Sequence, residues 1–117
     1  MERNKSDIYW VTGCPIPTGS GNRHEGLDNL LGLMGNHGLK LYRVEEDTGI
    51  GGKDGLIDRS DVVLIKVNAQ WKYRGCTNSD VVRGLVQMIL EHPDGFNGEI
   101  VLFENGQGGG SLDCDTM

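Results

Sequence analysis

The chain has 117 residues, of which 37% are hydrophobic and 24% are charged, and this composition is typical of one folded domain. Its net charge of −6 argues against a nucleic-acid partner, because binding to phosphates requires a basic face. No apolar run approaches the roughly 18 residues that a membrane span needs, and the N-terminus has no apolar core of a signal peptide. We therefore expect one domain over residues 1–117, cytoplasmic and without a membrane or nucleic-acid partner.

The chain begins with a predicted strand and helix. Residues 8–12 (IYWVT) are aromatic and β-branched, which predicts a first strand. Asn22 and Glu25, three residues apart, predict a capping box at the start of a helix, and His37 and Gly38 predict its end. Apolar residues at helical spacing predict the buried stripe of this helix: Leu27, Leu30, Leu31 and Met34.

Two further strands are predicted in the middle of the chain. Residues 39–44 (LKLYRV) alternate between apolar and polar, as in a strand with one exposed face. Residues 45–58 are rich in glycine and predict a mobile loop. Residues 61–67 contain the run VVLI, which is typical of a strand covered on both faces.

A second helix and a last strand follow. The helix is predicted to begin near Thr77 or Ser79, with Thr77 and Asp80 as a capping pair, and to end at His92, which precedes a proline. Residues 99–104 (EIVLFE) predict the last strand. The apolar stripe of the helix consists of Val81, Val82, Leu85, Met88 and Ile89.

This β-α-β-β-α-β order predicts an α/β fold, a three-layer sandwich with a mainly parallel four-stranded sheet. The link between the second and third strands fits either a parallel crossover or an antiparallel return. A glycine-rich loop after the last strand of such a fold normally leads into another helix. We therefore expect the chain to be truncated at its C-terminus and to be a fragment of a larger α/β domain.

The second half of the chain resembles the DUF362 family, a domain family of unknown function. Three segments carry this resemblance: VLIKVN over residues 63–68, TNSDVVRGLVQ over 77–87 and IVLFENGQG over 100–108. The chain departs from the family pattern at Val67, where a proline is usual, and at Glu104–Asn105, where a Gly-Asp pair is common. Because some relatives are joined to iron–sulfur modules, the resemblance implies at most a link to redox chemistry.

Three loops leave the carboxyl ends of predicted strands, over residues 13–22, 68–78 and 105–111. In an open parallel sheet such loops meet at one edge, where ligands bind. Lys66 precedes this edge and is predicted either to neutralise a carboxylate or phosphate, or to hold loop carbonyls in a purely structural role. The predicted anion-binding residues are Lys66, Asn68, Arg74, Thr77 and the glycine-loop backbone at Gly106, Gly108 and Gly109.

All three cysteines, Cys14, Cys76 and Cys114, lie in or beyond these loops. With His24 they are candidates for a metal or iron–sulfur site, since thiolates and imidazoles bind zinc and iron. Their spacing includes no CxxC pair, however, and buried or unreactive thiols are the favoured interpretation.

Three functions follow from these patterns. The leading hypothesis is a DUF362-like domain, an enzyme part or otherwise, that binds a small anion or an unknown cofactor at the carboxyl ends of its strands. The second is a redox or metal protein that uses its cysteines. The third is a non-catalytic assembly domain, whose partner is another copy or the remainder of a longer chain.

Overall fold

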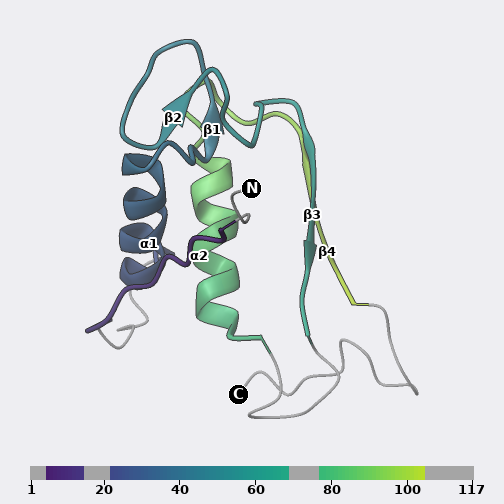
Figure 1. Ribbon diagram of the computed structural model, residues 1–117. Helices are drawn as coiled ribbons and strands as arrows, with labels where there is room; N and C mark the ends of the chain where they lie inside the picture. The colour runs from purple at the N-terminus through teal and green to yellow at the C-terminus, as the bar shows by residue number, and fades with distance from the viewer. Residues whose placement is uncertain (1–4, 15–21, 69–76, 105–117) are drawn as a thin grey trace.

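The computed structural model describes residues 5–14, 22–68 and 77–104. Two helices lie side by side, with one small sheet beyond their C-terminal ends and a second sheet on the other side of the second helix (Figure 1). The elements are α1 (Glu25–Asn36), β1 (Tyr42–Arg43), β2 (Gly51–Gly52), β3 (Val62–Lys66), α2 (Ser79–Leu90) and β4 (Glu99–Phe103).

The sheets define a mixed α/β fold. β1 pairs with β2, and β3 pairs with β4, both in parallel. The β3–α2–β4 unit is the parallel crossover that the alternation of strand and helix predicted. The described residues nevertheless form two separate two-stranded sheets and not the expected four-stranded one.

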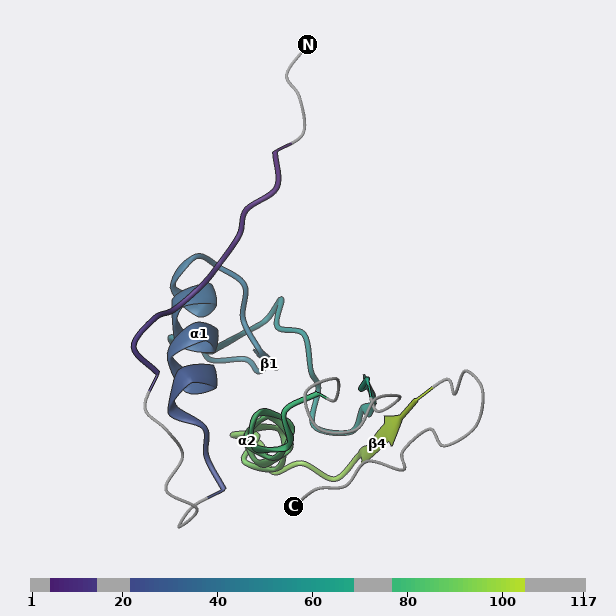
Figure 2. The ribbon, with the colours of Figure 1, turned by 90° about the horizontal axis from the view of Figure 1, so that it is seen from below.

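Residues 8–12 do not form the predicted first strand, and the described part of the chain places no strand beside them. They run along α1 instead, on its side away from β3 and β4 (Figure 2). The rings of Tyr9 and His37 lie 5.4 Å apart, whereas Ile8 and Trp10 are 84% and 70% exposed. A segment with strand propensity needs a hydrogen-bonded neighbour before it becomes a strand, and propensity alone cannot supply one.

α1 begins at a cap that the sequence did not indicate. The N-cap is His24, whose Nδ1 accepts a hydrogen bond of 3.0 Å from the N–H of Leu27. The predicted capping box at Asn22 is therefore wrong. The end of the helix is confirmed: Gly38 has a φ of +89°, and the following N–H, of Leu39, bonds back to Met34 at 2.9 Å.

The strand predicted over residues 39–44 is reduced to the pair Tyr42–Arg43. Its partner β2 lies inside the segment that was predicted as a loop, and Tyr42 also forms an isolated bridge to Ile57. Ile57 is only 5% exposed, so this segment contributes to the core. Gly55 permits the close approach, because a Cβ there would lie 1.9 Å from the carbonyl oxygen of Tyr42.

The core lies between the C-terminal half of α2 and the β1–β2 region. Tyr42 donates its hydroxyl to the carbonyl of Met88, and its ring meets that of His92 edge-on at 5.1 Å. His92 is 3% exposed; its Nδ1 accepts from Asp94 N–H, so Nε2 carries the proton and donates to Ile57 C=O at 2.9 Å. The buried apolar residues are Leu41, Tyr42, Val44, Ile57, Met88 and Ile89.

The β3–β4 sheet is covered on one face only. Val63, Ile65 and Ile100 pack against the core. Val62 and Leu64, which point to the opposite face, are 62% and 63% exposed. The prediction that β3 is buried on both faces is therefore wrong: the apolar run was read correctly as a strand, but no described element covers its outer side.

Candidate functional site

The carboxyl ends of β3 and β4 meet the start of α2, which is the predicted place for a ligand site (Figure 1). The N–H of Val67 bonds to the carbonyl of Phe103 at 3.0 Å, so the two strand ends stay paired to this edge. Thr77 N–H donates to Asn68 C=O at 2.7 Å, and Thr77 Oγ1 accepts from Asn68 N–H at 2.8 Å. The structure thus brings together Lys66, Asn68 and Thr77.

Lys66 is paired at this edge with a residue that the sequence analysis had not assigned to the site. Its Nζ lies 2.8 Å from Oε1 of Glu104 and 2.9 Å from the carbonyl oxygen of Val67. The Lys66 side chain is 50% exposed, whereas that of Glu104 is 6% exposed. The ammonium therefore lies between a sheltered carboxylate and solvent. Its bond to the Val67 carbonyl agrees with the predicted structural role of Lys66, and its contact with an anionic ligand stays a prediction.

The first turn of α2 is satisfied from within the chain. Asn78 is the N-cap: its Oδ1 accepts from Asp80 N–H at 2.8 Å and from Val81 N–H at 3.2 Å. The predicted capping role of Thr77 is therefore wrong. Asp80 adds a negative charge to the positive end of the helix dipole and lies 3.8 Å from Arg83. An anion at this edge would depend on Lys66 more than on the helix terminus.

The remaining predicted anion-binding residues, Arg74, Gly106, Gly108 and Gly109, lie outside the described residues. So do Cys76 and Cys114. Cys14 is an exposed free thiol. Its Sγ and Cε1 of His24 lie 2.5 and 3.0 Å from where a Cβ on Gly26 would stand, so these two predicted metal ligands are neighbours.

These two residues do not by themselves make a metal centre. Nδ1 of His24 already accepts the capping hydrogen bond, which leaves Nε2 as its one ligand atom. Among the residues that the structure describes, no group of three potential metal ligands occurs.

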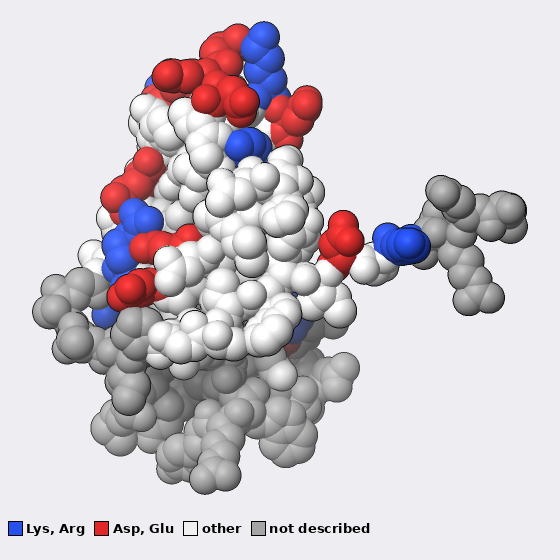
Figure 3. Space-filling model, turned by 60° about the vertical axis from the view of Figure 1, so that its left-hand side comes forward, with Lys and Arg blue, Asp and Glu red and all other residues white. Residues whose placement is uncertain are grey.

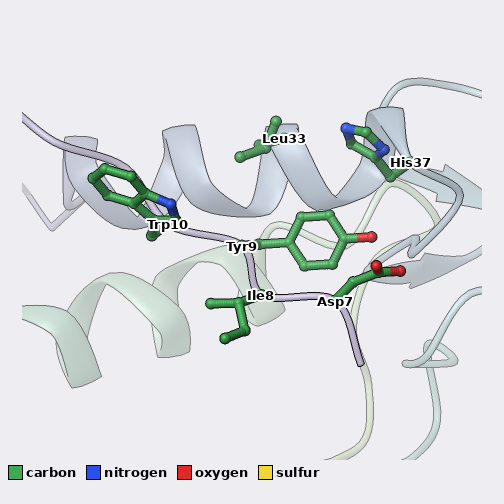
Figure 4. Close-up of a pocket in the computed structure, with 6 residues that line it drawn as sticks. All are labelled: Asp7, Ile8, Tyr9, Trp10, Leu33 and His37. Atoms are coloured by element: carbon green, nitrogen blue, oxygen red, sulfur yellow. The ribbon is translucent and has the colours of Figure 1, made fainter. Parts of the chain in front are cut away.

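A shallow cavity of about 340 Å³ lies away from the strand ends, between the N-terminal segment and α1. In Figure 4 the Tyr9 ring faces His37, while Ile8 points away from α1. This hollow combines aromatic surface with one carboxylate, and the sequence analysis gave no sign of it because residues 8–12 were assigned to a sheet. Its lining residues are Asp7, Ile8, Tyr9, Trp10, Leu33 and His37.

The charge of the molecule is unevenly placed. Acidic side chains gather at the β1–β2 end, at the top of Figure 3. The segment around β2 supplies exposed acidic residues there: Glu45, Glu46, Asp47 and Asp54. The ammonium of Lys40 donates hydrogen bonds to the carbonyl oxygens of Thr48 and Gly49 within this segment. These acidic side chains lie at the end of the molecule opposite the carboxyl ends of β3 and β4.

No family model, curated protein or solved structure matches the chain. The resemblance to the DUF362 family thus stays a prediction. Neither described helix is both long and apolar enough to cross a membrane.

Proposed function

We propose that the carboxyl edge of the β3–β4 sheet binds a small anion through Lys66. The observation that carries this proposal is the half-exposed ammonium at the strand end, held 2.8 Å from Glu104. An ammonium has three N–H donors, and the Glu104 carboxylate and the Val67 carbonyl engage two of them. The third donor is left for a ligand oxygen, and the half-exposed side chain is accessible to one.

Glu104 sets the strength of this site. Its carboxylate is sheltered, so it keeps Lys66 as its counter-ion, because an unpaired buried charge is costly. The pair has no net charge, which lowers the attraction for an incoming anion. We infer a weak anion site that is strengthened when the Glu104 carboxylate loses its charge.

Thr77 provides a second ligand contact. Its oxygen accepts from the N–H of Asn68, and its hydroxyl proton is left to donate. The predicted contacts at Asn68, Arg74 and the backbone of Gly106, Gly108 and Gly109 belong to the same proposal.

The test is a titration with inorganic phosphate, followed by phosphorus NMR, on the whole chain and on three variants. Lys66→Gln is expected to weaken binding by roughly tenfold or more, since a hydrogen bond to a charged group is worth about 1.5–3 kcal/mol. Glu104→Gln keeps the shape of the side chain, removes the competing charge and is expected to tighten binding.

The matched control is Lys53→Gln, which removes an exposed lysine next to β2 and is expected to leave phosphate affinity unchanged. Circular dichroism and thermal unfolding establish that each variant is folded. Equal phosphate affinity in wild type and Lys66→Gln would contradict the anion site, as would the absence of binding in both wild type and Glu104→Gln.

The redox or metal alternative rests on the neighbouring Cys14 and His24. Stoichiometric zinc or iron in protein purified without oxygen, lost in Cys14→Ser, would support it. Metal-free protein would exclude it.

The proposal also includes the four-stranded sheet that the sequence predicts. β3 and β4 would be half of a four-stranded sheet in a three-layer sandwich, and membership of the DUF362 family would account for VLIKVN and TNSDVVRG at its edge. Support comes from the exposed outer face of β3, where Val62 and Leu64 are more than half exposed. A circular dichroism spectrum with no more strand than the described pairs account for would argue against it.

A further inference from the structure

In the described structure, residues 8–12 have no strand partner and β3 has a partner on one edge only. Residues 8–12 have the composition of a strand and no strand partner, and Ile8 and Trp10 expose 84% and 70% of their surface. β3 pairs with β4 along one edge, and no described strand pairs with its other edge. A strand that adds to this edge would cover apolar surface on both partners.

The hydrogen bonds of β3 identify the groups at the open edge. Val67 N–H donates to Phe103 at 3.0 Å, and Glu99 N–H donates to Asp61 at 3.1 Å, so the odd-numbered residues of β3 face β4. Because successive peptide groups along a strand point in opposite directions, the N–H and C=O of Leu64 face the open edge. The Leu64 residue is also 63% exposed, on the outer face of that strand.

Charge favours the β3 edge and selects the direction of the added strand. β4 begins with Glu99 and is followed by Glu104, whereas β3 is preceded by Asp61 and ends in Lys66. A parallel strand would place Asp7 beside Asp61, and like charges opposite each other are destabilising. An antiparallel strand places Asp7 at the Lys66 end instead. Aligning the two segments centre to centre then pairs Trp10 with Leu64.

The position of the N-terminal segment argues against its pairing with the β3 of its own chain. Sγ of Cys14 lies 2.5 Å from the position of a Cβ on Gly26, which places the end of the segment against the start of α1. From there the segment runs along α1 on the side away from β3 and β4, and its N-terminal end projects from the body of the molecule (Figure 2). This position favours pairing with another molecule over pairing with the β3 of the same chain.

We propose that residues 8–12 of a second copy of this chain add as an antiparallel strand to the open edge of β3. The exchange is reciprocal, so it closes as a two-fold dimer. Ile8, Trp10 and Thr12 of one copy lie beside Lys66, Leu64 and Val62 of the other, on the outer face of the sheet. Trp10 exchanges hydrogen bonds with Leu64.

A disulfide between chains tests the register. Thr12→Cys and Val62→Cys are made in separate chains that have their native cysteines replaced by serine, and the two proteins are mixed and oxidised. Residues in such a hydrogen-bonded pair lie about 5.5 Å apart at Cα, within the range that a disulfide spans. We expect a disulfide-linked heterodimer in the mixture, and sedimentation velocity is expected to show the unmodified chain as a dimer.

Two single proline variants of the same segment distinguish a loss of strand pairing from a general effect of proline substitution. The N–H of residue 12 faces β3 in this register, whereas that of residue 11 faces away. Thr12→Pro is expected to raise the dimer dissociation constant about tenfold, and Val11→Pro much less. A monomer at every concentration, no disulfide-linked heterodimer in the oxidised mixture, or equal effects of the two prolines would overturn the proposal.

Discussion

The two sides of α2 differ in how completely they are closed. On one side, Met88 and Ile89 are 1% and 0% exposed and meet the β1–β2 region. On the other side, the inner face of the β3–β4 sheet packs against the core that includes α2. The outer face of that sheet is exposed at Val62 and Leu64. The closed side has the character of a domain core, and the open side that of an interface.

The buried polar groups on the closed side are hydrogen-bonded, which adds to the stability of this side. Its buried histidine, His92, satisfies both ring nitrogens with backbone groups, and the hydroxyl of Tyr42 bonds to the end of α2. No buried side-chain polar atom in the described residues lacks a partner. Stability should therefore depend strongly on this side and weakly on the outer face of β3.

The largest expected effect comes from truncating the core beside α2. Ile89→Ala is expected to lower the free energy of unfolding by about 2–5 kcal/mol, because it leaves a cavity at a fully buried site. Leu64→Ala, on the exposed face, should change it by only about 0.5 kcal/mol. Urea unfolding of dilute protein measures both, and equal losses would contradict the division into closed and open sides.

A smaller effect is expected from adding one methyl group. Gly55→Ala would place a Cβ 1.9 Å from the Tyr42 carbonyl oxygen, and we expect a loss of about 1–3 kcal/mol. Gly32 is the matched control, because its Cβ would meet nothing within 4 Å. Gly32→Ala should stabilise α1 by about 0.5–1 kcal/mol. Thermal unfolding of the two variants should shift in opposite directions.

Tyr42 should contribute about 1 kcal/mol through its hydrogen bond to Met88, measured as the loss in Tyr42→Phe. Burial raises the pKa of the Tyr42 hydroxyl. A raised pKa in the folded state gives stability that is present below about pH 10 and is lost as the pH rises through the folded value. Tyr42→Phe should therefore flatten this alkaline loss; an unchanged pH profile would refute the assignment.

The smallest expected effect is at acid pH. The hydroxyl and then the backbone N–H of Ser60 donate to the Asp58 carboxylate and lower its pKa. The resulting stability is present above about pH 4, the unfolded value, and is lost as the pH falls through the folded value. Ser60→Ala should reduce this loss between neutral and acid pH in thermal unfolding. A steeper acid loss in the variant would run against the expectation.

The strand–helix–strand unit of the second half could be predicted because its signals are local. The apolar run before Lys66, the helical stripe around Met88 and the strand before Glu104 each lie where the sequence indicated. The convergence of Lys66, Asn68 and Thr77 follows from that unit, since parallel strands end at one edge. The pairing of Lys66 with Glu104 was missed, although a carboxylate at the end of a parallel neighbour is the signal that could have indicated it.

The errors concern contacts between distant segments and the local choice of helix caps. An apolar run shows that β3 favours burial, but not which element covers each face. Residues 8–12 have strand propensity, but a partner edge decides whether they form a strand. At α1, Asn22 has the preferred residue type for a cap, yet His24 is placed to accept from Leu27. Whether Arg74 and Gly106 share the edge with Lys66 stays a prediction.

The most direct measurement of the open side is amide hydrogen exchange at Leu64 and Ile65 over a range of protein concentrations. The N–H of Ile65 faces β4 and should exchange slowly throughout. The N–H of Leu64 faces the open edge, so it should exchange fast in dilute protein and slow down as the dimer forms. Slow exchange at Leu64 in the most dilute sample would contradict an open β3 edge.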